Sequence, residues 1–275
     1  MQTFRIGGAL EVHRLGYGAM RLCGPRVTGW PADRAGALRV LRRAVELGVD
    51  FVDTADAYGP GVNELQVAEA LAPYDGVVVA TKGGLVRTGE PGEWPKDGRP
   101  EHLRAACEAS LRRLRLDAIP LYQLHRPDPQ VPLVESVGAL RDLRDEGKIR
   151  FVGLSNVDVA QLEEARAVVE IASVQNEYNL GNRASEPVLE LCERDGIAFL
   201  PWHPLNAGEL ARAGGPVDEV ARAHGSTHAQ VALAWLLQRS PVTIPIPGTA
   251  SLAHLEENVA ARELRLRQRD LAALA

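Results

Sequence analysis

The feature that most constrains the fold of this 275-residue chain is a repeated alternation of short apolar segments with stretches of helical spacing. A strand that is apolar along its whole length needs cover on both faces, which parallel sheets flanked by helices provide. Eight segments have this character: Leu15–Met20, Val49–Asp53, Val77–Thr81, Ile119–Leu124, Ile149–Leu154, Ala172–Gln175, Ile197–Leu200 and Val242–Ile246. The alternation therefore predicts an α/β protein with a parallel sheet.

Eight strand and helix units in a chain of this length fit a closed (β/α)8 barrel, the TIM barrel, better than an open sheet. The open doubly wound fold is the alternative, and it predicts a GxGxxG turn between a strand and a helix. Gly16 and Gly18 supply only the first two glycines of such a turn, and no helix follows them directly. The barrel is therefore the expected fold.

The N-terminal residues predict a short β-hairpin before the barrel, because Thr3–Ile6 and Leu10–Arg14 flank a Gly7–Gly8 turn. No linker or change of composition divides the chain, so we expect residues 1–275 to form a single domain. Capping residues mark three later helix starts. These are Asp158 with Gln161, Thr227 with Gln230, and Ser251, whose helix is expected to bury Leu252, Leu255 and Val259.

The composition argues against several classes of function. With 24% charged residues, a net charge of −5 and a pI of about 5.9, the chain lacks the basic surface that nucleic acids or anionic membranes require. Three cysteines without metal-type spacing indicate neither a disulfide framework nor a zinc site, and we expect no metal. The sequence contains no signal-peptide pattern and no apolar run long enough to span a membrane. A cytoplasmic location is the expectation, and the sequence leaves the oligomeric state open.

Polar or aromatic side chains follow most of the predicted strands, at the end where the active sites of barrels gather. Alone, each has an ordinary explanation: an aspartate after a strand often belongs to a turn, and a lysine is usually a solvated surface charge. Together they indicate a site. In chain order they are Asp53, Lys82, His125, Ser155, Asn156, Gln175, Trp202, His203, Gly248 and Thr249.

Four residues near three neighbouring strand ends suggest proton delivery to an oxygen. Asp53 would hold Lys82 as a charged partner, which removes the cost of an unpaired buried carboxylate. Lys82 beside Tyr58 would lower the tyrosine pKa, which starts near 10, and make Tyr58 a usable acid near neutral pH. His125 would fix the orientation of a substrate carbonyl. Reduction of a carbonyl by hydride is the natural case.

At these residues the sequence resembles the aldo-keto reductases. The matching segments are FVDTADAYG (Phe51–Gly59), ATK (Ala80–Lys82), LH (Leu124–His125), GLSN (Gly153–Asn156), VQNEYN (Val174–Asn179), IPGT (Ile246–Thr249) and EEN (Glu256–Asn258). They span nearly the whole chain in the order of the family. The resemblance implies a catalytic tetrad of Asp53, Tyr58, Lys82 and His125, and a small carbonyl compound as the substrate.

The resemblance also implies a reduced nicotinamide cofactor lying across the mouth of the barrel. Ser155, Asn156 and Gln175 match positions that hold its carboxamide, and Trp202 matches an aromatic residue, usually tyrosine, that stacks on the nicotinamide ring. The full set of expected contacts is Gly18, Ala19, Met20, Ser155, Asn156, Gln175, Trp202, Pro204, Leu205, Gly248, Thr249, His254, Glu257 and Asn258.

Two positions depart from the commonest pattern of the family. Many members have lysine in place of Gly248 and arginine in place of His254, where they bind the 2′-phosphate of NADPH. Thr249 and the amides at the start of the last helix can still bind a phosphate. We expect NADPH as the cofactor, with NADH as the alternative. The IPGT segment and the run Ala232–Pro241 resemble a bacterial branch, some members of which reduce aldehydes of the pyridoxal type.

Loops after the strands are expected to form the substrate pocket. The candidate residues are Trp30, Trp94, Arg126 and His203. Trp94 belongs to a long polar loop at residues 83–99, and the sequence does not show whether this loop closes over the site. Arg126 either binds an anionic group of the substrate by a charge-assisted hydrogen bond or points into solvent.

Three other functions are compatible with parts of the sequence. A Schiff-base lyase would use Lys82 as the nucleophile, but it leaves Tyr58 unexplained. A metal hydrolase would use His125 and His203, which lack ligand spacing. A non-catalytic relative is the third, because QNEYNL at Gln175–Leu180 also resembles the β subunits of potassium channels, which share the fold and bind the cofactor.

Overall fold

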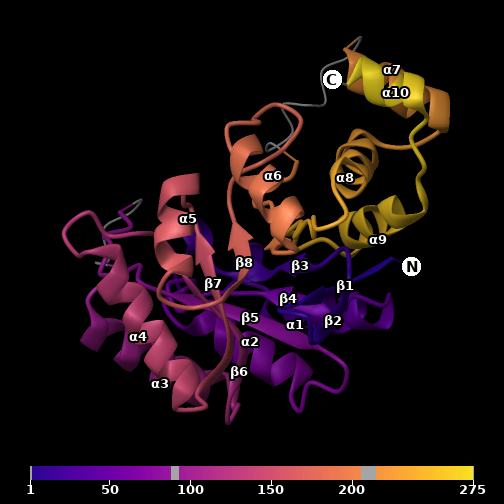
Figure 1. Ribbon diagram of the computed structural model, residues 1–275. Helices are drawn as coiled ribbons and strands as arrows, with labels where there is room; N and C mark the ends of the chain where they lie inside the picture. Colours follow the sequence, from indigo (N-terminus) through magenta and orange to yellow (C-terminus); the bar gives the residue numbers. More distant parts are fainter. Residues whose placement is uncertain (1, 88–92, 206–214, 275) are drawn as a thin grey trace.

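The computed structural model describes residues 2–87, 93–205 and 215–274. Seven parallel strands form one curled sheet in sequence order, and the helices lie around its outside (Figure 1). This confirms the expected α/β barrel architecture. The strands are β3 (Tyr17–Gly18), β4 (Phe51–Asp53), β5 (Val78–Gly83), β6 (Ile119–Leu124), β7 (Ile149–Ser155), β8 (Ile171–Gln175) and β9 (Ala198–Phe199).

The three helix starts predicted from capping residues are found, and the described residues form ten α-helices. They are α1 (Arg34–Glu46), α2 (Val62–Leu71), α3 (Pro100–Leu114), α4 (Leu133–Asp145), α5 (Val159–Arg166), α6 (Glu186–Asp195), α7 (Pro216–His224), α8 (His228–Arg239), α9 (Leu252–Ala260) and α10 (Gln268–Ala273). Both predicted capping boxes are present, at Asp158 and Thr227, and Ser251 caps α9. Leu252 is 41% exposed, so its assignment to the buried face of α9 is wrong.

The eighth predicted strand, Val242–Ile246, forms no ladder of its own. It makes one isolated bridge, Phe199 to Thr243, and otherwise uses single hydrogen bonds. Ile244 N donates to Phe199 O on one side (2.8 Å), while Pro245 O accepts from Gly16 N on the other (2.9 Å). Because Pro245 and Pro247 have no N–H, they can accept but cannot donate to a neighbouring strand. The segment therefore closes the barrel between β9 and β3 without being a regular strand.

The N-terminal hairpin is confirmed, with β1 (Thr3–Ile6) antiparallel to β2 (Leu10–His13). Its apolar side chains join those inside the barrel in one buried cluster: Ile6, Leu10, Val12, Phe51, Ala80, Leu121, Ala172, Ala198, Leu200, Ile244 and Ile246. His13 N donates to Asp50, directly before β4, at 2.9 Å. The hairpin therefore covers the end of the barrel where the strands start, and the opposite end stays open to loops.

Helix α2 has no counterpart in the sequence expectations, because its inward side is polar. Asn63, Glu64 and Gln66 are fully buried, and the helix starts at Gly61 in a left-handed conformation without a side-chain cap. The usual signals of apolar periodicity and a capping side chain are both missing. The helix α10 was also not expected. No helix among the described residues is long and apolar enough to cross a membrane.

We predict that Gly18→Ala destabilises the protein by about 1–3 kcal/mol, because an added Cβ would lie 2.7 Å from Ile246 O in the closing segment. The matched control is Gly138→Ala in α4, where an added Cβ meets nothing within 4 Å. That change should stabilise by about 0.5–1 kcal/mol through helix propensity. Urea unfolding of both variants gives the measurement, and equal midpoints would contradict the close approach at Gly18.

Candidate active site

Three neighbouring parallel strands bring the four predicted catalytic residues together. Asp53 ends β4, Lys82 lies near the end of β5, and His125 follows β6. Tyr58 lies in the turn between β4 and α2. Because β4, β5 and β6 pair in order, their carboxyl ends meet at one edge of the barrel mouth. The four residues that the sequence grouped into one site contact one another in the structure: Asp53 pairs with Lys82, and Lys82 and His125 lie against the ring of Tyr58.

Lys82 and Asp53 form a buried ion pair. Lys82 Nζ is 2.6 Å from Asp53 Oδ1 and donates a second bond of 2.9 Å to Thr54 O. The side chain of Lys82 is fully buried and that of Asp53 is 4% exposed. Burial lowers the pKa of Lys82, but Asp53 and Tyr58 outweigh it, so the net direction is upward. Lys82 therefore stays protonated in the interior.

Tyr58 packs among Lys82, His125 and Trp94. Lys82 Nζ lies 5.2 Å from the centre of the tyrosine ring. The rings of His125 and Trp94 meet Tyr58 edge to face, with centroid distances of 5.7 and 6.4 Å. Burial raises the pKa of Tyr58, and the charge of Lys82 lowers it by less. The expectation that Lys82 brings this pKa below its ordinary value is wrong, because the loss of water dominates in so buried a site.

His125 is held in its neutral form. Its pKa lies well below the ordinary value, because burial and then the positive charges of Lys82 and Arg126 disfavour the imidazolium. The backbone N–H of His125 donates to Gly83 O at 2.9 Å, which continues the pairing of β5 and β6. The Nδ1 atom is buried and has no hydrogen-bond partner within the described part of the chain. The imidazole is therefore a neutral hydrogen-bonding group beside Tyr58.

The second oxygen of Asp53 is occupied by two side-chain amides. Gln175 Nε2 donates to Asp53 Oδ2 at 2.9 Å, and Gln123 Nε2 does so at 3.3 Å. Gln175 was expected at the cofactor carboxamide, which stays a prediction; in this structure its amide nitrogen binds Asp53. Gln123 was missed because it sits inside an otherwise apolar strand. The two-residue period of a strand could have found it, since Gln123 and His125 are two apart.

Asn156, directly after β7, and Trp202, shortly after β9, are linked by a hydrogen bond. Asn156 adopts a left-handed backbone with φ of 61°, and its Oδ1 accepts from Trp202 Nε1 at 3.2 Å. Its amide nitrogen donates to His125 O and to Ser155 Oγ, at 3.1 and 2.8 Å. The indole stacks on His203 with an interplanar angle of 28°, and His203 Nδ1 is 3.1 Å from Glu177. The indole ring of Trp202 is therefore held beside Asn156, whose amide also binds the backbone oxygen of His125.

The seam between β3 and the closing segment carries the other expected cofactor residues. An added Cβ at Gly248 would lie 2.6 Å from Gly18 O, so this position cannot take the lysine that the resemblance would place there without a backbone shift. Tyr17 donates its hydroxyl to Thr249 O at 2.5 Å, and Thr249 Oγ1 accepts from Ser251 N at 3.0 Å. The sequence missed Arg21, an exposed residue whose Cγ would lie 3.5 Å from such a Cβ.

The remaining expected residues lie on both sides of this seam. Ala19 and Met20 begin a 3-10 helix at Ala19–Leu22, Pro204 is buried, and Leu205 packs on Leu15 and Leu233. On α9, His254 is exposed, Asn258 is buried, and Glu257 accepts a bond of 2.5 Å from Thr227 at the start of α8.

Trp30 is 41% exposed and lies under the guanidinium of Arg34, at 4.1 Å. The described ring contacts therefore place Trp94, and not Trp30, against Tyr58.

A buried polar network behind the site supports both the first loop and the tyrosine turn. Thr54 Oγ1 donates to Asn63 Oδ1 (2.7 Å), and Asn63 Nδ2 donates to Ala19 O (2.9 Å). Glu64 accepts from Thr81 at 2.5 Å and pairs with Arg113 at 2.6 Å. The polar inward side of α2 therefore fixes the two segments that border the barrel mouth. In the described ranges no group of three or more His, Cys, Asp or Glu is arranged to hold a metal.

Comparison with known proteins identifies the family. The family model described as the aldo/keto reductase family matches residues 14–275, so the chain belongs to the aldo/keto reductases, which are oxidoreductases. An uncharacterized oxidoreductase of Schizosaccharomyces pombe is 48% identical over 264 residues, covering 96% of this chain and 86% of that protein. Pyridoxine 4-dehydrogenase of Escherichia coli is 43% identical over 280 residues, covering 99% and 96%.

The same relationship is seen in three dimensions. The crystal structure of an aldo/keto reductase from Klebsiella pneumoniae in complex with NADP and acetate superposes with a TM-score of 0.84 at 31% sequence identity. The match covers 99% of this chain and 94% of that one. The fold and the class of enzyme are thus established.

We predict a pH-dependent stability effect at Asp56, which lies in the tyrosine turn. Burial and the nearby charge of Glu64 raise the pKa of Asp56 to about 8, and its Oδ1 has no partner in the described residues. The folded state then keeps a proton that the unfolded state loses from about pH 4 upward, so wild-type stability falls as pH rises toward 8. Asp56→Asn removes this dependence.

Urea unfolding at pH 5 and pH 8 measures the effect. The stability of Asp56→Asn relative to wild type should increase between the two pH values. A difference that stays constant would mean that Asp56 is ionised in the folded protein throughout this range.

Proposed function

We propose that this protein reduces the carbonyl group of a small aldehyde or ketone to an alcohol with NADPH, and that Tyr58 donates the proton. One observation carries the proposal. A buried, protonated Lys82 held by Asp53 lies against the ring of Tyr58, and a neutral His125 packs on the other side of that ring. This arrangement suits a reaction in which an oxygen gains negative charge and takes up a proton.

The raised pKa of Tyr58 gives the tyrosine a defined role. At neutral pH the phenol keeps its proton, so it meets the substrate as an acid. Once the proton has moved to the carbonyl oxygen, the phenolate is stabilised by the positive charge of Lys82. Asp53 keeps Lys82 charged and in place, with Gln175 and Gln123 binding its other oxygen. Asp53 therefore acts through Lys82.

His125 is suited to orient the carbonyl oxygen. As a neutral imidazole it can donate a hydrogen bond without adding a positive charge that would compete with Lys82. Its position is set by β6 and by the bond from Asn156 to its backbone oxygen. We assign the tetrad roles on this basis: Tyr58 as acid, Lys82 as its electrostatic support, Asp53 as the holder of Lys82, and His125 as the orienting group.

The residues at the mouth fit a nicotinamide cofactor, which when bound supplies the hydride. Trp202 offers a flat ring braced by Asn156 and His203. Ser155 Oγ accepts a bond from Asn156, and its own proton has no acceptor within the described chain, so it can donate to a carboxamide oxygen. The Klebsiella pneumoniae relative was solved with NADP, which supports NADPH over NADH. The name of the Escherichia coli relative makes pyridoxal the first aldehyde to assay.

Tyr58→Phe should lower kcat for aldehyde reduction by about 10²–10⁴-fold, because the proton donor is lost while the ring remains. The dissociation constant of NADPH, followed by tryptophan fluorescence, should change by only a few-fold. Tyr74→Phe is the matched control, since it removes the hydroxyl of another buried tyrosine, one that donates to Leu114 O at 2.7 Å. Turnover near the wild-type rate in Tyr58→Phe would overturn the mechanism.

Arg21→Gln should weaken binding of NADPH more than binding of NADH. Arg21 is exposed beside Gly248, has no ion-pair partner in the described residues, and can supply the charge that a lysine at 248 would bring. A lost charge-assisted bond to a phosphate predicts about a tenfold increase in the Kd of NADPH. Arg42→Gln, an exposed residue of α1, is the charge-matched control. Equal effects on both cofactors would rule out a contact with the 2′-phosphate.

The structure argues against one of the alternative functions, and an assay decides a second. A Schiff-base mechanism requires a neutral lysine, whereas the pKa of Lys82 is raised by Asp53 and Tyr58. A non-catalytic relative would bind NADPH without turnover. Steady-state oxidation of NADPH in the presence of an aldehyde, dependent on Tyr58, separates that function from the proposed one.

A further inference from the structure

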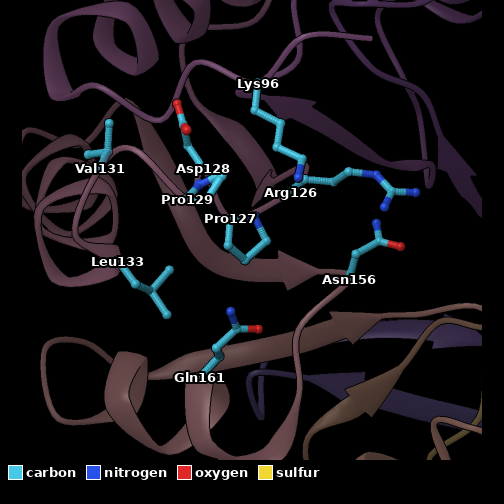
Figure 2. A pocket seen from close by; sticks show the side chains of 9 residues that line it. All are labelled: Lys96, Arg126, Pro127, Asp128, Pro129, Val131, Leu133, Asn156 and Gln161. Atoms are coloured by element: carbon cyan, nitrogen blue, oxygen red, sulfur yellow. The ribbon is translucent and has the colours of Figure 1, made fainter. Parts of the chain in front are cut away.

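A cavity of about 400 Å³ opens next to the tetrad, between the loops that follow β5, β6 and β7. Two cations and two side-chain amides belong to its lining. Figure 2 shows Lys96 and Arg126 on one side of this cavity and Gln161 on the other. Arg126 directly follows His125, and Gln161 lies in the first turn of α5. The proposed reduction gives no role to the two cations.

Neither cation is neutralised by an acid in the described residues. Lys96 and Arg126 have no ion pair there, although most arginines on the outside of the barrel do. Asp128 also lines the cavity, but its two oxygens accept from backbone amides, Oδ2 from Gly98 N at 3.0 Å and Oδ1 from Gln130 N at 2.9 Å. With Asp128 included, the lining carries two cations and one carboxylate, so its net charge is positive and favours an anionic ligand.

The segment that carries Lys96 is held in place by its backbone. Leu85 and Lys96 form an antiparallel bridge, and Val86 N donates to Pro95 O at 2.8 Å. Further along, Ser136 of α4 donates to Gly98 O at 2.6 Å. Lys96 therefore projects from a short, paired strand-like segment at a fixed place on the rim. A preorganised rim loses less entropy when it binds a ligand than a flexible one.

Arg126 also connects this cavity with the reaction site. Arg126 is the next residue after His125, and its charge is among those that hold the pKa of His125 low. Arg126 and Asn156 line a second, adjoining hollow of about 730 Å³ that reaches Trp202. Asn156 in turn binds His125 O and Trp202 Nε1. A small molecule with its carbonyl group beside His125 can therefore extend a second group toward Arg126.

We propose that the cavity lined by Lys96 and Arg126 binds an anionic group of the substrate, a carboxylate or a phosphate, while the carbonyl group lies at Tyr58 and His125. The planar guanidinium suits two parallel bonds to such a group, and the ammonium adds a second charge. Gln161 can contribute its amide from the opposite wall. The inference rests on the proposed function for the position of the carbonyl group, and it narrows the substrate class to anionic aldehydes and ketones.

The test is an equilibrium titration that needs no turnover. Protein saturated with NADPH is titrated calorimetrically with three alcohols of the same skeleton: 4-(hydroxymethyl)benzoate, 4-(hydroxymethyl)phenyl phosphate, and the neutral methyl 4-(hydroxymethyl)benzoate. Reduced cofactor and alcohol cannot react with each other. At low salt, at least one anionic ligand should bind about tenfold or more tightly than the neutral ester, and added salt should reduce the difference. The stronger of the two anions identifies carboxylate or phosphate.

Three variants assign the effect to this cavity. Arg126→Gln should abolish the preference for the anion, and Lys96→Gln, at an exposed position that cannot disturb folding, should reduce it several-fold. Arg42→Gln makes the same change of net charge on α1 and should keep the preference. Equal binding of anion and ester by the wild type, or an unchanged preference in both cavity variants, would overturn the proposal. So would a preference that disappears in Tyr58→Phe, since the anion would then lie at the acid itself.

Failure of this inference is distinguishable from failure of the proposed function. A protein that reduces neutral aldehydes with Tyr58 but binds anions no better than esters keeps the function and loses the anion site. A protein that shows the preference in the titration but no reduction keeps the site and loses the function.

Discussion

The buried ion pair between Lys82 and Asp53 is the interaction on which the rest of the site depends. Two charges removed from water need further hydrogen bonds beside the ion pair itself, and here Thr54 O accepts from Lys82 while Gln175 and Gln123 donate to Asp53. This requirement explains why the open end of the barrel is lined with amides. It also explains how one lysine can influence both neighbours, because in a dry site its charge acts on Tyr58 and His125 with little screening.

The sequence was sufficient for the order of the first seven barrel strands and for the grouping of Asp53, Tyr58, Lys82 and His125. Both follow because the ends of consecutive parallel strands meet at one end of a barrel. It was not sufficient for the eighth strand. Pro245 and Pro247 look like minor interruptions of an apolar run, but they have no N–H group to donate, so the segment makes single hydrogen bonds to β9 and to Gly16 and Gly18 in place of a regular ladder.

The direction of the Tyr58 pKa shift and the partner of Gln175 could not be derived from sequence, for a different reason. The pKa of Tyr58 depends on a balance between burial, which raises it, and the charge of Lys82, which lowers it. The bond from Gln175 to Asp53 joins residues that are 122 positions apart in the chain. A sequence pattern identifies such contributions but gives neither their magnitudes nor the distances between remote residues. The polar face of α2 was hidden in a similar way, because Asn63, Glu64 and Gln66 read as surface residues until their partners in the β3 loop, β5 and α3 are known.

The topology of the barrel sets an order in which the site can be completed during synthesis. Asp53, Lys82 and His125 lie at the ends of strands that are consecutive in the chain and pair with their immediate neighbours, and Tyr58 lies in the turn after the first of these strands. Gly16 and Gly18, in contrast, obtain their partners from Pro245 and Pro247, more than two hundred residues later. A ribosome must therefore release nearly the whole chain before the seam between β3 and the closing segment exists. The group around Lys82 can form early, and this seam forms last.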